Sequence, residues 1–469
     1  MLFNSFQYWI FFFIVAVLFY SMPFRFGKVL LLLASYVFYM WWDPRFIVLI
    51  LTSTVVDYYL GILLEAATGR RKKLLFAVSL VVNLGILGFF KYYDFFAGSL
   101  ADLVHIPRSS VVLQVVLPIG VSFYTFASLS YTFDVYWGKM KAVRNVIDYA
   151  LFIAFFPHLI AGPIIRARQF ISQIQFWKSP AAIVIQSGII LVLSGLIKKM
   201  VFADRFAAVA DSYFNDPMSH PGWLAAWSGC FAFIVQVFFD FSGYTDIARG
   251  CAKLLGFEFP LNFARALLAR NPPDLWQRWH ITLSTWVRDY VFMPFSRGRK
   301  GRLVLYRNMF VVMVLVGLWH GANWTFVAWG AYHGLLLIGY RVFDRATVGT
   351  PVDQVMKKRW FVPFSIGAML MAFVFSGAFF RPKTLQTSGH VLSGLLGFQH
   401  VTGEFLLTTG TIVLIFISLF LAAAQERSQF IDRLALQPAR IQIPAYVCAF
   451  LALELFPATG PVPFVYFQF

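Results

Sequence analysis

Long apolar stretches recur along almost the whole chain, and they limit the folds open to it more than any other feature. A helix needs about 17–25 mostly apolar residues to cross the hydrocarbon core of a bilayer. Several stretches are short or interrupted by Gly and Pro, which makes some of them candidates for re-entrant segments. We therefore predict an all-α polytopic membrane protein with about 11–13 transmembrane helices. The candidate spans lie near residues 5–22, 28–42, 46–64, 74–97, 111–137, 148–165, 183–203, 223–245, 304–322, 324–340, 361–380, 405–424 and 441–457.

The composition agrees with this interpretation. Hydrophobic residues make up 59% of the chain and charged residues only 13%, which is more apolar surface than one soluble core can bury. The net charge of +18 raises nucleic acid as a partner, but Lys and Arg cluster between the apolar stretches, so we expect a lipid bilayer and no nucleic acid. Cys230, Cys251 and Cys448 lie far apart, and we expect neither a disulfide framework nor a bound metal.

The basic clusters predict the orientation. They follow the first, third and fifth candidate spans, so they lie on one side if the spans alternate, and that side is cytoplasmic by the positive-inside rule. The chain is then a multi-pass protein of the cell inner membrane with a periplasmic N-terminus. Basic residues at both ends of one span leave the topology between 148 and 210 open. The clusters used are Arg25 and Lys28, residues 70–73, and Lys139, Lys141 and Arg144.

The region of about 255–300 is the one long segment that does not resemble a span. It mixes Arg and Asp with Trp and Leu, which is typical of an interfacial segment or of one that re-enters the membrane. No linker or internal repeat divides the chain, so we expect a single transmembrane domain over residues 1–469.

His320 is the strongest candidate for chemistry. If a helix begins near Arg307, thirteen residues at about 1.5 Å each place His320 roughly 20 Å along it, deep in the membrane. A titratable group at that depth is costly and usually functional, and an imidazole there can accept a hydroxyl proton as a general base. Gly317 and Gly321 would allow close approach of a substrate or of another backbone. The alternative is a neutral buried His that holds helices together through one hydrogen bond.

A second candidate follows the pair Pro272-Pro273. Prolines stop a preceding helix, and Asp274 is a suitable N-cap for a new one. A continuous helix from there would place Trp276, His280 and Ser284 on one face, four residues apart. The alternative is an interfacial helix anchored by Trp rings with a solvated His.

A third candidate is Asp240-Phe241-Ser242-Gly243-Tyr244-Thr245-Asp246, directly after an apolar run. Two carboxylates at the end of a span suit the orientation of an imidazole or the binding of a cation, and a hydrogen-bonded helix end is the alternative. His158 lies in a broken segment and is a candidate for lining a cavity.

These residues also carry a resemblance to a known family. Trp276-Gln277-Arg278-Trp279-His280, followed about forty positions later by Gly317-Leu318-Trp319-His320-Gly321, resembles the paired His motifs of membrane-bound O-acyltransferases. Further strings resemble the bacterial alginate O-acetyltransferase branch of that family, so that the resemblance covers nearly the whole chain: residues 117–124, 156–164, 240–246 and 466–469.

The resemblance implies a ring of tilted helices around a funnel, with short in-plane helices in a thin floor that a narrow passage crosses. It implies that His320 and His280 are the catalytic pair, with His280 lining the passage. We predict as further lining residues Trp276, Trp279, Trp319, Ser284, Asn323, His158, Asp240, Tyr244 and Asp246.

On this basis we expect an O-acetyltransferase that moves an acetyl group across the membrane for O-acetylation of an exported polysaccharide, alginate or a similar polymer. The donor would be acetyl-CoA, used as a substrate and not as a permanently bound cofactor, with Arg297, Arg299 and Lys300 as candidates for attracting its phosphates. The acceptor would be the polysaccharide itself or an extracytoplasmic acetyltransferase. Two alternatives stay open: D-alanyl transfer from a carrier protein to teichoic acid, and a secondary transporter without covalent chemistry.

Overall fold

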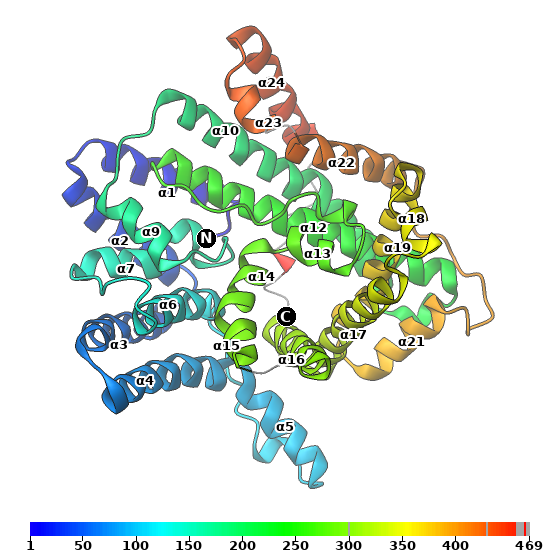
Figure 1. Ribbon diagram of the computed structural model, residues 1–469. Coiled ribbons are helices and arrows are strands. Elements are labelled where there is room, and N and C mark those ends of the chain that lie inside the picture. The colour runs from blue at the N-terminus through cyan, green and yellow to red at the C-terminus, as the bar shows by residue number, and fades with distance from the viewer. Residues whose placement is uncertain (299–300, 428–429, 456–463, 466–469) are drawn as a thin grey trace. The chain divides into compact units, whose positions relative to one another are not determined.

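The computed structural model describes residues 1–298, 301–427, 430–455 and 464–465. All regular elements in these ranges are helical, and Figure 1 labels most of them. The chain divides into two compact units, residues 1–192 with 244–260 and residues 193–243 with 261–469. Two helices have residues in both units, α10 (Ala182–Leu196) and α12 (Trp223–Leu254).

The first unit consists of helices that pack in sequence order and across it. Neighbours such as α1 and α2 or α3 and α4 are in contact, and α6 packs on both α3 and α4. A π-helical turn, Gly88–Tyr92, joins α4 to α5. The helices are α1 (Phe6–Tyr20), α2 (Phe24–Met40), α3 (Ile47–Ala66), α4 (Gly69–Leu87), α5 (Tyr93–Leu103), α6 (Val121–Tyr136), α7 (Val146–Ala154), α8 (Phe156–Leu159) and α9 (Ala167–Gln175).

A buried carboxylate joins three of these helices. Asp57 on α3 is fully buried and accepts hydrogen bonds from Ser79 Oγ and Asn83 Nδ2 on α4, each 2.6 Å long, and from Ser128 Oγ on α6. Burial of a charge or dipole without partners is costly, so hydrogen bonds from three donors make this site a connector between helices.

The second unit holds the hairpin of α16 and α17 and the short helices of the region around 255–300. A buried cluster also lies here: Lys199 Nζ is 2.7 Å from both Asp204 Oδ1 and Asp240 Oδ1, and Asp240 Oδ2 accepts a 2.6 Å hydrogen bond from Val465 N. The helices are α11 (Asp204–Phe214), α13 (Pro272–Arg278), α14 (Ile281–Val287), α15 (Met293–Ser296), α16 (Arg302–His320), α17 (Trp324–Thr347), α18 (Pro351–Met356), α19 (Val362–Phe375), α20 (Gly377–Phe380), α21 (Leu385–Leu395), α22 (Thr409–Arg427), α23 (Phe430–Ala435) and α24 (Ala439–Leu455).

Helices α16 and α17 run side by side as an antiparallel hairpin (Figure 1). Glycines permit this close packing. A Cβ on Gly317 would lie 2.2 Å from Phe326 O, and a Cβ on Gly330 would lie 2.4 Å from Met313 O. The two main chains are therefore in direct contact, which is a common way for membrane helices to associate.

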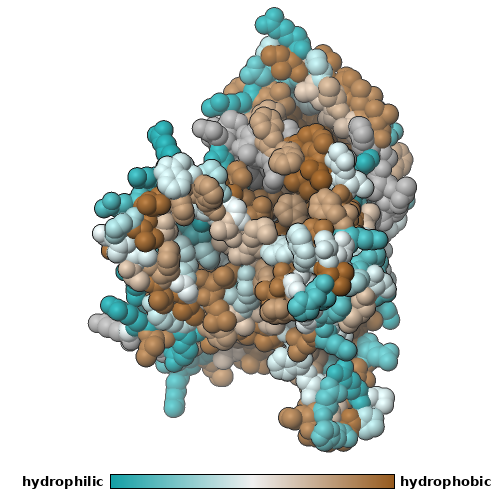
Figure 2. Space-filling view, turned by 90° about the vertical axis from the view of Figure 1, so that its right-hand side faces the viewer, coloured by the Kyte–Doolittle hydropathy of each residue, from teal (hydrophilic) through white to brown (hydrophobic). Residues whose placement is uncertain are grey.

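Six helical segments of the described residues are long and apolar enough to cross a membrane. Figure 2 shows apolar side chains spread over the face seen there, with hydrophilic ones mostly at its margins. The prediction of an all-α polytopic membrane protein is confirmed, whereas the count of 11–13 spans and the ring around a funnel stay predictions. The six segments are Pro44–Ala66, Gly69–Leu103, Ala182–Phe214, Trp223–Leu254, Arg302–His320 and Arg359–Phe380.

Two predicted spans are wrong in extent. The stretch 148–165 is not one helix, because the chain turns at Phe155 (φ −53°, ψ 111°) and the short α8, with Pro157 near its start, follows. The stretch 111–137 becomes helical only after Gly120, whose φ of +77° lets the chain turn into α6.

Candidate active site

His320 is the last residue of α16, and the chain continues in an extended conformation at Gly321. The helix begins at Arg302, five residues before the predicted start, so His320 lies about 27 Å from that end along the axis. Its side chain is 5% exposed. The ring is enclosed by aromatic rings, with centroids 4.9 Å from Trp329 and 5.1 Å from Phe380. A buried imidazole in an aromatic enclosure is shielded from bulk water, which suits a reaction centre that must avoid hydrolysis.

His280 lies between two short helices and not within one. It has a left-handed backbone (φ 45°, ψ 53°), so α13 ends at Arg278 and α14 starts at Ile281. The predicted face shared by Trp276, His280 and Ser284 is therefore wrong. The predicted N-cap is also wrong, because the side chain of Asn271 caps α13 by accepting a 2.8 Å bond from Asp274 N.

Asn262, which no sequence motif singles out, holds His280 in place. Its main-chain carbonyl accepts from Ile281 N (2.9 Å), and its Oδ1 accepts from Thr282 Oγ1 (2.8 Å) and lies 3.1 Å from His280 Nδ1. Because Oδ1 is an acceptor for its neighbours, Nδ1 of the ring carries the proton and Nε2 presents a lone pair.

The neutral form of His280 is strongly favoured. The ring is fully buried, and this burial lowers its pKa to about 3. Its Nε2 has no hydrogen-bond partner among the residues that the structure describes. His280 is thus built to accept a hydrogen bond near neutral pH, and with so low a pKa it is a weak base.

Trp319 connects the two histidines. The Trp319 ring lies 4.9 Å from the His320 ring and 5.8 Å from the His280 ring. Trp279 is buried against Phe263 and Phe373 at 5.1 and 4.8 Å. His320, His280, Trp319 and Trp279 therefore gather in the second unit, as the prediction of one site requires.

A third histidine joins this group. His333 on α17 is fully buried, and its ring lies 4.5 Å from Trp329 and 5.3 Å from Trp276. Trp329 thus contacts both His320 and His333. No motif surrounds His333 in the sequence; its spacing of four residues from Trp329 on one helix was the signal available.

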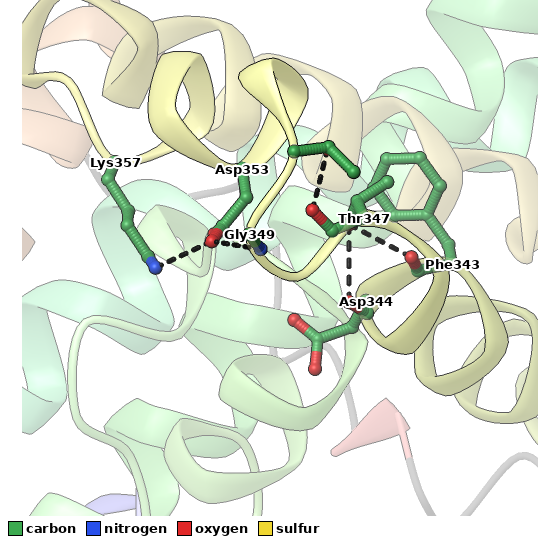
Figure 3. Close-up of polar contacts among 7 residues, drawn as sticks. Phe343, Asp344, Thr347, Gly349, Asp353 and Lys357 are labelled. Carbon is green, nitrogen blue, oxygen red and sulfur yellow. Dashed lines mark hydrogen bonds and ion pairs between the residues drawn. The ribbon is translucent and has the colours of Figure 1, made fainter.

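An arginine pocket of about 670 Å³ lies between α13 and α17. Four arginines face two aspartates in its lining, so positive charge dominates. Figure 3 shows how α17 ends beside it: Thr347 Oγ1 donates to the carbonyls of Phe343 and Asp344, and Asp353 Oδ2 accepts from Gly349 N. The pocket is lined by Arg270, Asn271, Pro273, Asp274, Gln277, Arg278, Tyr340, Arg341, Asp344 and Arg345.

Three other predicted residues of the second unit have partners that account for them. Ser284 Oγ donates to Trp279 O at 3.3 Å, and Asn323 caps α17 by accepting from Thr325 N at 3.0 Å. Asp240 pairs with Lys199, and it lies inside the continuous α12, so its predicted place at a helix end is wrong.

The remaining predicted residues belong to the first unit. His158 is buried among phenylalanines, with Nε2 3.1 Å from Phe152 O. The Tyr244 ring stacks on Phe3 at 4.4 Å, and Asp246 Oδ1 lies 3.4 Å from Arg249 NH1. A role for these three in the passage stays a prediction, as do the catalytic roles of His320 and His280.

Comparison with known proteins adds an independent observation. A model of the membrane-bound O-acyltransferase family matches residues 71–381. The chain belongs to this family. One relative that matches most of the chain is a probable alginate O-acetylase AlgI of Pseudomonas aeruginosa. It is 36% identical over 417 residues, which cover 86% of this chain and 77% of the relative.

Two further relatives widen the range of acceptors in the family. A peptidoglycan O-acetyltransferase of Helicobacter pylori is 33% identical over 405 residues, which cover 80% of this chain and 75% of the relative. A teichoic acid D-alanyltransferase of Bacillus subtilis is 30% identical over 239 residues, which cover 48% of this chain and 60% of the relative. The protein is therefore a multi-pass membrane O-acyltransferase, and the alternative of a transporter without covalent chemistry is wrong.

Proposed function

We propose that this O-acyltransferase takes an acetyl group from cytosolic acetyl-CoA and passes it across the cell inner membrane for O-acetylation of an exported polysaccharide, alginate or a similar polymer. The observation that carries the proposal is the buried His320 in its aromatic enclosure, within a chain whose longest matches are named O-acetylases or O-acetyltransferases. The D-alanyltransferase match spans 48% of the chain, so the acetyl group is the better supported cargo.

The proposed reaction uses His320 as general base. A ring nitrogen accepts the proton of the acceptor hydroxyl, and the hydroxyl oxygen attacks the carbonyl carbon of the thioester. The carbon–sulfur bond then breaks, and the thiolate takes the proton from the imidazolium. Because His320 ends α16, the negative end of the helix dipole favours the positive charge that the ring acquires during the reaction.

His280 takes a different part in this mechanism. Its Nε2, which has no partner within the described ranges, can accept a hydrogen bond but binds no proton near neutral pH, since burial lowers the pKa of the ring to about 3. We assign it to orienting a hydroxyl or amide of a substrate beside Trp319, and we leave the proton transfer to His320.

The arginine pocket supports an anionic donor. Arginine binds phosphate through two parallel hydrogen bonds, and four arginines against two aspartates suit the phosphates of CoA. This pocket is a second candidate beside the cluster of Arg297, Arg299 and Lys300, of which residues 299–300 lie outside the described residues. We assign this end of α17 to the cytoplasm, because its basic residues Arg341 and Arg345 fit the positive-inside rule.

The test measures transfer of radiolabelled acetyl from acetyl-CoA in inner-membrane vesicles that contain the protein and an added acceptor polymer. His320→Ala should reduce labelling of the polymer by about 10²–10⁴-fold, the usual contribution of a general base. The matched control is His105→Asn, at an exposed loop position with φ 57° that Asn tolerates, and it should label normally.

Two results would contradict the proposal, and a third would specify its acceptor. Normal labelling by His320→Ala would remove its reaction centre. Labelling that requires a D-alanyl carrier protein would indicate the D-alanyl alternative. Labelling of an added extracytoplasmic acetyltransferase before the polymer would instead keep the chemistry and identify the protein partner as the acceptor.

A further inference from the structure

We propose that His333 and Trp276 bind the amide-bearing arm of the acyl donor, between the arginine pocket and His320. The inference rests on the proposed function, because it takes the donor to be a phosphopantetheine thioester such as acetyl-CoA. It adds two residues that hold the arm and distinguishes them from the arginines that hold its phosphates.

The first argument is the hydrogen-bonding state of the two side chains. His333 is fully buried, and neither of its ring nitrogens has a hydrogen-bond partner among the described residues. The buried Nε1 of Trp276 likewise lacks a partner within the described part of the chain. Most buried polar atoms in proteins are paired, so two adjacent side chains with three unpaired nitrogens indicate a site for a polar ligand.

The second argument is chemical complementarity. The indole nitrogen only donates, whereas a neutral imidazole donates from one nitrogen and accepts at the other. An amide presents a carbonyl acceptor and an N–H donor, so a chain with amides matches both groups. A purely hydrocarbon chain would leave all three nitrogens unpaired and would bind poorly here.

The third argument is position along α17. Trp329, His333 and Tyr340 are separated by four and seven residues, so they lie on one stripe of the helix. At one end, Trp329 contacts His320 at 4.9 Å; at the other, Tyr340 and Arg341 line the arginine pocket. The distance from Trp329 to Arg341 is about 18 Å along the axis, which suits an extended arm.

Helix α13 supplies the opposite side of the same route. It packs on α17, and Trp276 is the direct neighbour of Gln277, which lines the arginine pocket. The Trp276 ring lies 5.3 Å from His333 and 5.9 Å from Trp329. The two rings are therefore in edge-to-face contact on the stretch of α17 between the pocket and the enclosure of His320.

The test compares two probes on the full chain purified in detergent micelles. CoA carries both the arm and phosphates, whereas adenosine 3′,5′-bisphosphate carries phosphates without the arm. His333→Phe keeps a ring of similar shape and removes the nitrogens, so it should raise the Kd for CoA about 10-fold and leave the Kd for the bisphosphate within about 2-fold. Trp276→Phe should act in the same direction, and His333→Gln should recover part of the affinity.

Two control variants separate the causes. Arg341→Met should weaken both probes, because it acts on phosphate binding. Tyr332→Phe, on the neighbouring position of α17 where the hydroxyl donates to Ala372 O, should weaken neither. Should His333→Phe fail to fold, as judged by its thermal unfolding, Trp276→Phe and His333→Gln still decide the question.

Each outcome bears on one of the two proposals. A wild-type protein that binds no CoA overturns the choice of donor and the arm site together. A wild-type protein that binds CoA with variants of His333 and Trp276 that bind it equally well overturns the arm site alone. Equal weakening of both probes by His333→Phe also overturns it, since that result indicates a structural effect.

Discussion

The Asp57 network of the first unit and the His333–Trp276 pair of the second both place polar groups inside a helical core. They differ in how their hydrogen bonds are met. Asp57 accepts bonds from Ser79, Asn83 and Ser128, whereas His333 and Trp276 have no partner among the described residues. The first arrangement stabilises the fold by itself, while the second costs stability unless a ligand completes it. The comparison teaches that the hydrogen-bonding state of a buried group separates a connector from a binding site better than its residue type does.

The largest effect on stability is expected at Asp57. Asp57→Leu leaves the donors of Ser79, Asn83 and Ser128 without their acceptor, so we expect the free energy of unfolding to fall by ~3 kcal/mol. Thermal unfolding in detergent measures the change. The control Asp102→Ala removes an exposed pair with Arg108 and should leave the free energy of unfolding nearly unchanged. A stable Asp57→Leu protein without transferase activity would break the comparison, because it would make the network a functional site.

A smaller effect is expected at Asn262, on activity. Asn262→Ala removes the acceptor that orients the His280 ring, so we expect the rate of acetyl transfer to fall by about 10-fold. Asn262→Asp keeps an acceptor at the same position and should retain more activity. Steady-state kinetics on both variants, together with their thermal unfolding, check the prediction. Equal losses for both variants would show that the amide nitrogen matters, and the role assigned to Oδ1 would be wrong.

The smallest effect is a pH dependence of stability from His280. The pKa of this ring is lowered to about 3, whereas an unfolded His titrates near 6.5, so between these values the unfolded chain binds the extra proton. Stability should therefore fall as the pH drops from about 6.5 toward 3. His280→Gln should reduce the drop in the thermal midpoint between pH 7.5 and 5.5 by an amount worth ~1 kcal/mol. An unchanged drop would show that His280 does not contribute to it.

The hairpin of α16 and α17 is the part of the fold that the sequence predicts best. The apolar stretches near 304–322 and 324–340 correspond to Arg302–His320 and Trp324–Thr347, and only the C-terminal end of the second is far off. The predicted span ends too early because the last turns of α17 are exposed and carry arginines, which are not expected in an apolar membrane span.

The failures have a common cause in contacts between residues far apart in the sequence. The left-handed backbone of His280 is held by hydrogen bonds that Asn262, eighteen positions earlier, accepts, and no residue near His280 in the sequence indicates them. The motif at Asp240–Asp246 looked like a helix end because it is polar, yet Lys199 compensates Asp240 and lets α12 continue. His333 had no motif at all. Periodicity predicts the helices, but it does not predict which buried polar groups they pair.

The contact between Gly317 and Phe326 O has a practical consequence for engineering. Since two main chains touch, the spacing of His320, Trp329 and His333 is set by backbone geometry and hardly depends on the side chains around it. Residues 302–347 are thus a suitable block to exchange between relatives with different acceptors. If the whole block is exchanged, the contacts between its two helices are kept. A chimera joined between Gly317 and Gly330 would instead pack helices from two different proteins against each other.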